Sequence, residues 1–264
     1  MTDKERRKQA AILHRRRILI ENSFIPRLKK EMKRMYEQAS EDYSVGGRDR
    51  VIIGLEEHQK NLANLLEMLY LVCAESSRNY LVDSFGKRGI IKKETKGVSD
   101  AFLWVLSTFR KFALAQSTQI AETSKAGIIA VIEDGLNQRD EEGRGVILGP
   151  AEIARNIRKT GLEVTKFRTE LIARTETGMA LNQSQDEIVQ GMDSIGQPIK
   201  VWNAINNSRT RKDHREVDGV SVPRDGLFTV GRDKMKYPGD RSASAANICN
   251  CRCSVLYLIE GIDL

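Results

Sequence analysis

The sequence has few cysteines, few prolines and no long apolar run, and each shortage narrows what the chain can be. Four cysteines in 264 residues are too few for a disulfide scaffold. No stretch reaches the roughly 20 consecutive apolar residues that a membrane-spanning helix requires. The basic N-terminal segment lacks the apolar core of a secretion signal. We therefore expect a protein without a membrane span that stays in the cytoplasm where it is made.

The charge is positive and unevenly distributed. The chain carries a net charge of +7, and residues 1–50 hold 14 Lys or Arg against 8 Asp or Glu. Such a segment is attracted to nucleic-acid phosphates, acidic protein surfaces or anionic lipid, although a solvated helix face explains interleaved charges equally well. No zinc-finger, RRM or homeodomain pattern accompanies it. The side chains predicted to bind DNA or a partner are those of Arg15, Arg16, Arg17, Lys29 and Lys30.

Apolar residues recur every three or four positions through the first half of the chain, which predicts long amphipathic helices. The first helix is expected to end at Gly46-Gly47, with Pro26 kinking it or starting a second helix. Another helix follows, on whose apolar face Cys73 is a small buried hydrophobe. Long helices with short connections predict a helical domain over residues 1–140 that presents a binding surface.

The second half has a different pattern. Residues 133–149 contain five acidic residues and four glycines, a composition typical of a domain boundary. Pro150 then starts a short helix that Gly161 should end. Short apolar runs split by turn residues follow, and the last of them predicts a strand over 249–259. The fold class is therefore α+β: an N-terminal long-helix domain, then a C-terminal domain (150–264) of helices and a small antiparallel sheet.

Four stretches of the second half resemble the phage Mu F-like head morphogenesis family: a helical Arg-Thr-Glu, a Trp strand before Arg-x-x-His and Asp-Gly, a Tyr-Pro-Gly-Asp turn, and a terminal Asn-Cys-Arg-Cys. Each is common alone, but their order and spacing over about residues 150–257 are specific. The residues that carry the resemblance are Arg174, Glu176, Trp202, Arg211, His214, Asp218, Gly219, Tyr237, Pro238, Asn250 and Arg252. The family commonly has an acidic residue after the Trp. This chain has Asn-Asn-Ser at residues 206–208, so a metal or catalytic role of that acidic residue is not expected here.

The resemblance implies a function. Family members are low-copy minor head (minor capsid) proteins of bacteriophages that act in procapsid assembly at the portal vertex, in the head interior, and aid DNA ejection. The portal protein is the implied partner, with scaffolding or major capsid protein and packaged DNA as further partners. The implied location is the virion, and the host cytoplasm during assembly. The first half resembles no family, as expected if it is adapted to each phage's own portal or capsid.

Two further functions remain open beside the assembly role. An enzyme, ADP-ribosyltransferase or nuclease-like, would gather Arg174, Glu176, Arg211 and His214 in a cleft, with His214 as a general base oriented by Asp218. In the structural alternative, Arg211, His214 and Asp218 form a polar network that pins the turn before Gly219. No nucleophile accompanies these residues, so we assign no catalytic residue and expect no enzyme. A DNA-binding protein delivered with the genome is the other alternative, and it is compatible with the assembly role.

The candidate metal ligands are His214, Cys251 and Cys253. Alternate Cα atoms of a straight strand lie about 6.6 Å apart, so Cys249, Cys251 and Cys253 cannot all reach one tetrahedral ion without a bend. Two of them with His214 and another ligand could bind zinc. The alternative is reduced cysteines packed on the sheet, and we expect no cofactor other than such a zinc ion.

Overall fold

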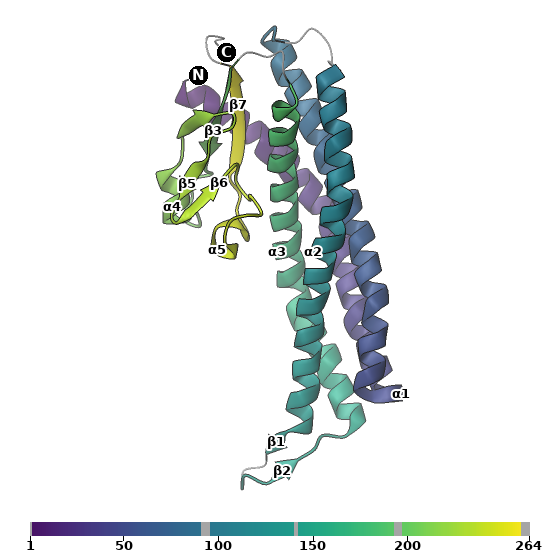
Figure 1. Cartoon of the computed structure of the whole chain (residues 1–264). Coiled ribbons are helices and arrows are strands. Elements are labelled where there is room, and N and C mark those ends of the chain that lie inside the picture. Colours follow the sequence, from purple (N-terminus) through teal and green to yellow (C-terminus); the bar gives the residue numbers. More distant parts are fainter. Residues whose placement is uncertain (1, 91–95, 140–141, 193–196, 260–264) are drawn as a thin grey trace. The chain divides into compact units, whose positions relative to one another are not determined.

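Figure 1 shows the computed structural model of the chain. The chain divides into two compact units. The residues described are 2–90, 96–139, 142–192 and 197–259. The motif unit, named for the family motifs it contains, consists of residues 1–23, 69–110 and 171–264, and the helical unit consists of residues 24–68 and 111–170. Each unit contains residues from before and after the domain boundary that the composition of residues 133–149 predicts. The compact units therefore do not coincide with the sequence ranges 1–140 and 150–264, because the long helices pass from one unit into the other.

The first helix, α1 (Asp3–Lys87), is a helical hairpin. Thr2 caps it: its hydroxyl accepts the Glu5 N–H, and the Glu5 carboxylate accepts the Thr2 N–H. At Gly47 the backbone leaves helical geometry, with φ 65° and ψ −155°, which confirms the predicted break. Pro26 lies within the helix, so the prediction that a second helix starts there is wrong. A long packed helix tolerates the one hydrogen bond that proline removes.

The helical unit contains parts of α1, α2 (Lys96–Leu136) and α3 (Pro150–Gln190). A small hairpin of β1 (Gln138–Arg139) and β2 (Gly145–Val146) separates α2 from α3. The prediction that Gly161 ends a short helix is wrong, since α3 continues through it. Gly161 is buried against Tyr36, and a Cβ atom at this position would lie 2.4 Å from the Tyr36 Cβ. The glycine therefore allows close packing of two helices and does not cap one.

The motif unit contains two small antiparallel sheets. In the larger sheet β3 (Pro198–Asn203) lies between β4 (Ser221–Pro223) and β7 (Ser254–Ile259). Figure 1 shows β3 beside β7. The second sheet pairs β5 (Phe228–Val230) with β6 (Asp233–Met235). The short helices α4 (Lys212–Glu216) and α5 (Ala245–Ile248) lie in the connections. Long helices followed by small antiparallel sheets confirm the predicted α+β class.

The last strand begins later than predicted. It starts at Ser254, whereas the alternating pattern predicts a strand from Cys249. The reason is a turn: Asn250 has a left-handed backbone with φ 60°, and the Cys251 N–H donates to the Ile248 carbonyl. Cys249, Cys251 and Cys253 therefore do not share one strand face. The bend that a metal site would need is present.

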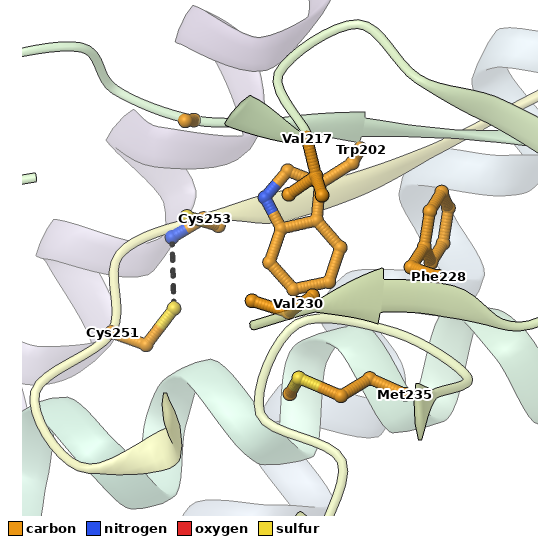
Figure 2. Close-up of a cluster of buried hydrophobic side chains, with 8 residues drawn as sticks. Trp202, Val217, Phe228, Val230, Met235, Cys251 and Cys253 are labelled. Atoms are coloured by element: carbon orange, nitrogen blue, oxygen red, sulfur yellow. Dashed lines mark hydrogen bonds between the residues drawn. The ribbon is translucent and has the colours of Figure 1, made fainter. Parts of the chain in front are cut away.

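A hydrophobic core lies beside this turn (Figure 2). It consists of Trp202, Ala204, Val217, Phe228, Val230, Met235, Cys251 and Cys253. The Trp202 ring meets those of Phe228 and His214 edge-on, with centroids 5.3 and 5.7 Å away. The core thus extends from the sheet to the candidate ligands. Within the described part of the chain, no helix offers an apolar stretch long enough to cross a membrane.

Candidate functional site

The Arg-Thr-Glu motif of α3 holds the Asn250 turn in place. Arg174 donates to the Asn250 side-chain oxygen at 2.7 Å, and the hydroxyl of Thr175 accepts the Asn250 N–H at 2.9 Å. Arg17 joins the same two segments, because it donates to the carbonyl oxygens of Arg174 and Cys251 at 2.7 and 2.6 Å. The left-handed turn is therefore fixed by side chains from distant parts of the sequence.

Glu176 lies two residues after Arg174 on α3, so its side chain points away from this turn. It is buried, and its carboxylate accepts hydrogen bonds from the Tyr70 hydroxyl and, at 3.4 Å, from Arg241. Burial raises the pKa of Tyr70 well above its usual range, so the hydroxyl stays protonated and remains a donor. Glu176 is thus an ion-pair partner within the motif unit and does not share a cleft with Arg174.

His214 lies against two cysteine sulfurs. Its Nδ1 is 3.4 Å from the Cys253 Sγ and 3.6 Å from the Cys251 Sγ, and its Nε2 is 3.2 Å from the Asn247 Oδ1. All three candidate ligands are buried. A hydrogen bond from the Cys253 thiol, with one from the Cys253 backbone N–H, holds the pKa of Cys251 well below its ordinary value. The Cys253 pKa is raised, because that thiol shares its proton with Cys251.

Asp218 is bound by the N-terminal segment and not by His214. It accepts hydrogen bonds from Arg6 at 2.7 Å, the Ala204 N–H at 2.8 Å and the Asn206 side chain at 2.5 Å. Burial raises its pKa, but the hydrogen bonds and charge of Arg6 outweigh burial, so the pKa lies below its ordinary value. Gly219 next to it has φ 82° and donates its N–H to the Trp202 carbonyl at 2.8 Å.

The pairing of His214 with Asp218, which both the catalytic and the structural hypothesis assume, is therefore wrong. His214 is on α4 and points into the core, whereas Asp218 follows the helix and meets Arg6. Arg211 belongs to neither contact, because it donates to the Cys249 carbonyl. The spacing of these residues along the chain suggested a network, but the end of α4 sends their side chains in different directions.

The Tyr-Pro-Gly-Asp turn is held by its own aspartate and by α3. Asp240 accepts the N–H groups of Lys236 and Ser242, at 2.7 and 3.0 Å. The Pro238 carbonyl accepts the side-chain amide of Asn182 at 2.9 Å. Tyr237 is buried, and burial raises its pKa well above the usual range. The motif therefore positions a turn and offers no exposed reactive group.

Asn182 has a structural role that no sequence motif indicated. Its side chain also donates to the Cys253 carbonyl at 3.2 Å and accepts the Val255 N–H at 3.1 Å. It thus joins the start of β7 to α3 in the way a neighbouring strand would. The five polar residues 182–186 are all buried, and such a run within a helix is the pattern that could have revealed it.

A buried ion pair was missed as well. Lys200 on β3 and Asp186 on α3 are almost inaccessible to solvent, and their charged atoms lie 3.3 Å apart. Tyr257, which lies opposite Lys200 on β7, donates to the same carboxylate. Burial raises the pKa of Asp186, against the attraction of Lys200. These three groups link the sheet to the helix.

The predicted DNA-binding side chains have unequal environments. Arg15, Lys29 and Lys30 are exposed. Arg16 is half-buried and donates to the Ser76 carbonyl. Arg17 is only 5% exposed and is fully engaged by Glu21 and two carbonyls, so its inclusion in a DNA-binding set is wrong.

A shallow pocket opens beside the cysteines. Its wall includes His214, Cys251 and Cys253 together with Arg209, Arg211 and Arg252. Burial and the nearby charges of Arg174 and Arg17 lower the pKa of Arg252. The arrangement is cationic around a pair of sulfurs, which favours thiolates and other anions.

Comparisons with known proteins agree with the motifs. A family model described as "Phage Mu protein F like protein" matches residues 132–256. A stretch of 114 residues is 28% identical to the minor head protein GP7 of Bacillus phage SPP1; it covers 43% of this chain and 36% of that protein. A stretch of the same length is 32% identical to the NAD(+)--arginine ADP-ribosyltransferase EFV of Enterococcus faecalis and covers 23% of it. The chain therefore matches only about a quarter to a third of each relative. No solved structure matches.

Proposed function

We propose that this chain, whose residues 132–256 match the family model "Phage Mu protein F like protein", is a phage minor head protein that acts in procapsid assembly at the portal vertex and is packaged in the head interior. The proposal rests on the family match, and the similarity to a phage minor head protein supports it. Aid to DNA ejection is part of the same proposal. Scaffolding or major capsid proteins are secondary candidate partners.

The geometry of the motif residues supports an assembly role. Arg174 and Thr175 build a turn, Glu176 pairs with Arg241, and Asp218 binds Arg6. These contacts join segments up to 212 residues apart in sequence. Side chains used in this way give a stable unit that presents a defined surface to other proteins.

The test of location is quantitative mass spectrometry of purified phage particles, comparing procapsids with DNA-filled heads. We expect a few copies per particle in both. Absence from both kinds of particle would contradict the proposal. Presence in procapsids with loss from particles that have ejected their DNA would support a role in ejection.

The test of the portal contact is capture of the full chain by purified portal protein. The full chain is used for this capture because residues 1–140 alone do not contain either compact unit. Lys29→Glu/Lys30→Glu, which reverses two exposed charges of the basic segment 1–50, tests whether that segment takes part. Lys212→Glu, which reverses an exposed charge in the motif unit, is the control. Failure of the unaltered chain to bind portal, scaffolding or major capsid protein would contradict the assembly role.

The similarity to an arginine ADP-ribosyltransferase favours a second candidate function, NAD-dependent transfer to arginine. Less than a quarter of that enzyme is matched, and Glu176, the motif glutamate, is bound by Arg241 and Tyr70. The assay is release of nicotinamide from NAD by the full chain with an arginine-containing acceptor. Turnover that Glu176→Gln abolishes, in a variant that remains folded, would favour the enzyme. No release above background would favour assembly alone.

A further inference from the structure

We propose that His214, Cys251 and Cys253 bind one zinc ion through Nδ1 and two thiolate sulfurs. The three ligand atoms lie within 4.8 Å of one another. A tetrahedral zinc with ordinary bond lengths separates an imidazole nitrogen from a thiolate sulfur by about 3.6 Å. The observed separations are 3.4 and 3.6 Å, so both nitrogen–sulfur distances already match those of such a site.

The hydrogen bonds of Asn247 select the histidine nitrogen that faces the sulfurs. The Asn247 amide donates to the Val230 carbonyl at 3.1 Å and to the Asp233 carboxylate at 2.8 Å. Its oxygen must therefore be the atom turned to His214, and it accepts the Nε2–H at 3.2 Å. In the neutral imidazole, this tautomer turns the Nδ1 lone pair toward Cys251 and Cys253. A second hydrogen bond that fixes the tautomer is usual for zinc-binding histidines.

A backbone N–H is hydrogen-bonded to one of the two sulfurs. The Cys253 backbone N–H is 3.4 Å from the Cys251 Sγ, shown as the dashed line in Figure 2. The indole nitrogen of Trp202 is buried without a nitrogen or oxygen acceptor, and Figure 2 shows it on the side of Cys253. N–H groups directed at sulfur stabilise thiolates, the form in which cysteine binds zinc.

The fourth ligand is a water molecule. Among the described residues, no other His, Cys, Asp or Glu joins this group. The three ligands also line the shallow pocket with Asn207 and Arg209, so its opening gives solvent access to the remaining corner. The ion would hold α4, which carries His214, against the turn that precedes β7. This inference does not depend on the assembly role.

The first experiment measures the metal content of the full chain, purified under reducing conditions with zinc chloride and then desalted. We expect about one zinc per chain in the unaltered protein and a loss in Cys251→Ser and Cys253→Ser. Cys249→Ser is the matched control, since Cys249 lies in the same turn but outside the ligand group, and it should retain the metal. Absence of zinc from the unaltered chain, or retention by Cys251→Ser/Cys253→Ser, would overturn the proposal.

A second measurement needs no variant, in case the serine substitutions fail to fold. The unaltered chain is stripped of metal and titrated with cobalt chloride, and the absorption spectrum is recorded. We expect the thiolate-to-cobalt charge-transfer band and the intense d–d bands of a tetrahedral site, both removed by adding zinc. A spectrum like that of cobalt in buffer would overturn the proposal, as would thiols that bind no metal and are found oxidised to a Cys251–Cys253 disulfide.

Discussion

Gly161 provides the sharpest test of how the helical unit packs. It is buried in the middle of α3, and a Cβ atom there would lie 2.4 Å from the Tyr36 Cβ and 2.6 Å from its Cγ. Tyr36 is 3% exposed, so the ring has little room to move away. Gly161→Ala should gain about 1 kcal/mol from helix propensity and lose about 1–3 kcal/mol from overpacking. We expect a net destabilisation of up to about 2 kcal/mol.

Gly127 on α2 is the matched control. It is exposed, and the nearest atom to an added Cβ is the Tyr36 hydroxyl at 4.0 Å, an ordinary contact. Gly127→Ala should therefore keep the full helix-propensity gain of about 1 kcal/mol. The same substitution is thus expected to change stability in opposite directions at the two positions.

The assay is thermal unfolding followed by circular dichroism on the two variants and the unaltered chain. For a protein of this size, roughly 2–4 °C of Tm corresponds to 1 kcal/mol. We expect Gly127→Ala to melt above the unaltered chain and Gly161→Ala below it. If Gly161→Ala raised Tm as much as Gly127→Ala, the close contact with Tyr36 would not govern this position and the packing argument would be refuted.

Three further predictions concern the motif unit. Asp186→Ala leaves the buried Lys200 without its partner and should cost about 3–5 kcal/mol, measured by urea unfolding; a cost below 1 kcal/mol would contradict the ion pair. Asn182→Ala leaves the Val255 N–H and two carbonyls without their partner and should cost about 2–4 kcal/mol, with Asn156→Ala at a partly exposed position of α3 as a near-neutral control. The pKa of Asp218 is lowered on folding, so its contribution is present above its unfolded value, near 3.9, and is lost as pH falls through the folded value. Asp218→Asn should therefore be less stable at neutral pH and lose less stability below about pH 4, and an unchanged dependence of Tm on pH would contradict this.

Local patterns in the sequence predicted the features that depend on neighbouring residues. The helix break at Gly47 follows from a backbone conformation that glycine adopts without strain, and the amphipathic helices follow from spacing along the chain. The order of the family motifs indicated the family that the comparisons found over residues 132–256. The three candidate zinc ligands were also named from sequence, although on a strand geometry that the structure replaces with a turn.

Features that depend on distant residues could not be predicted in this way. Gly161 looks like a helix end until Tyr36 is seen against it, because glycine serves close packing as well as capping. Arg17 looks like a free cation until its partners from α3 and the cysteine turn are known. The residues next to a side chain in sequence do not identify the groups that contact it in the folded protein.

The sequence by itself determined the α+β class, the break at Gly47 and the likeness to the family whose model matches residues 132–256, since helix periodicity, turn residues and motif order are local properties of the chain. Only the tertiary structure decided which groups meet: Arg6 with Asp218, Glu176 with Arg241, and His214 with two cysteines. The physical reason is that charge pairing and ligand geometry depend on separations of a few ångströms. Folding creates those separations between residues that lie as many as 212 positions apart.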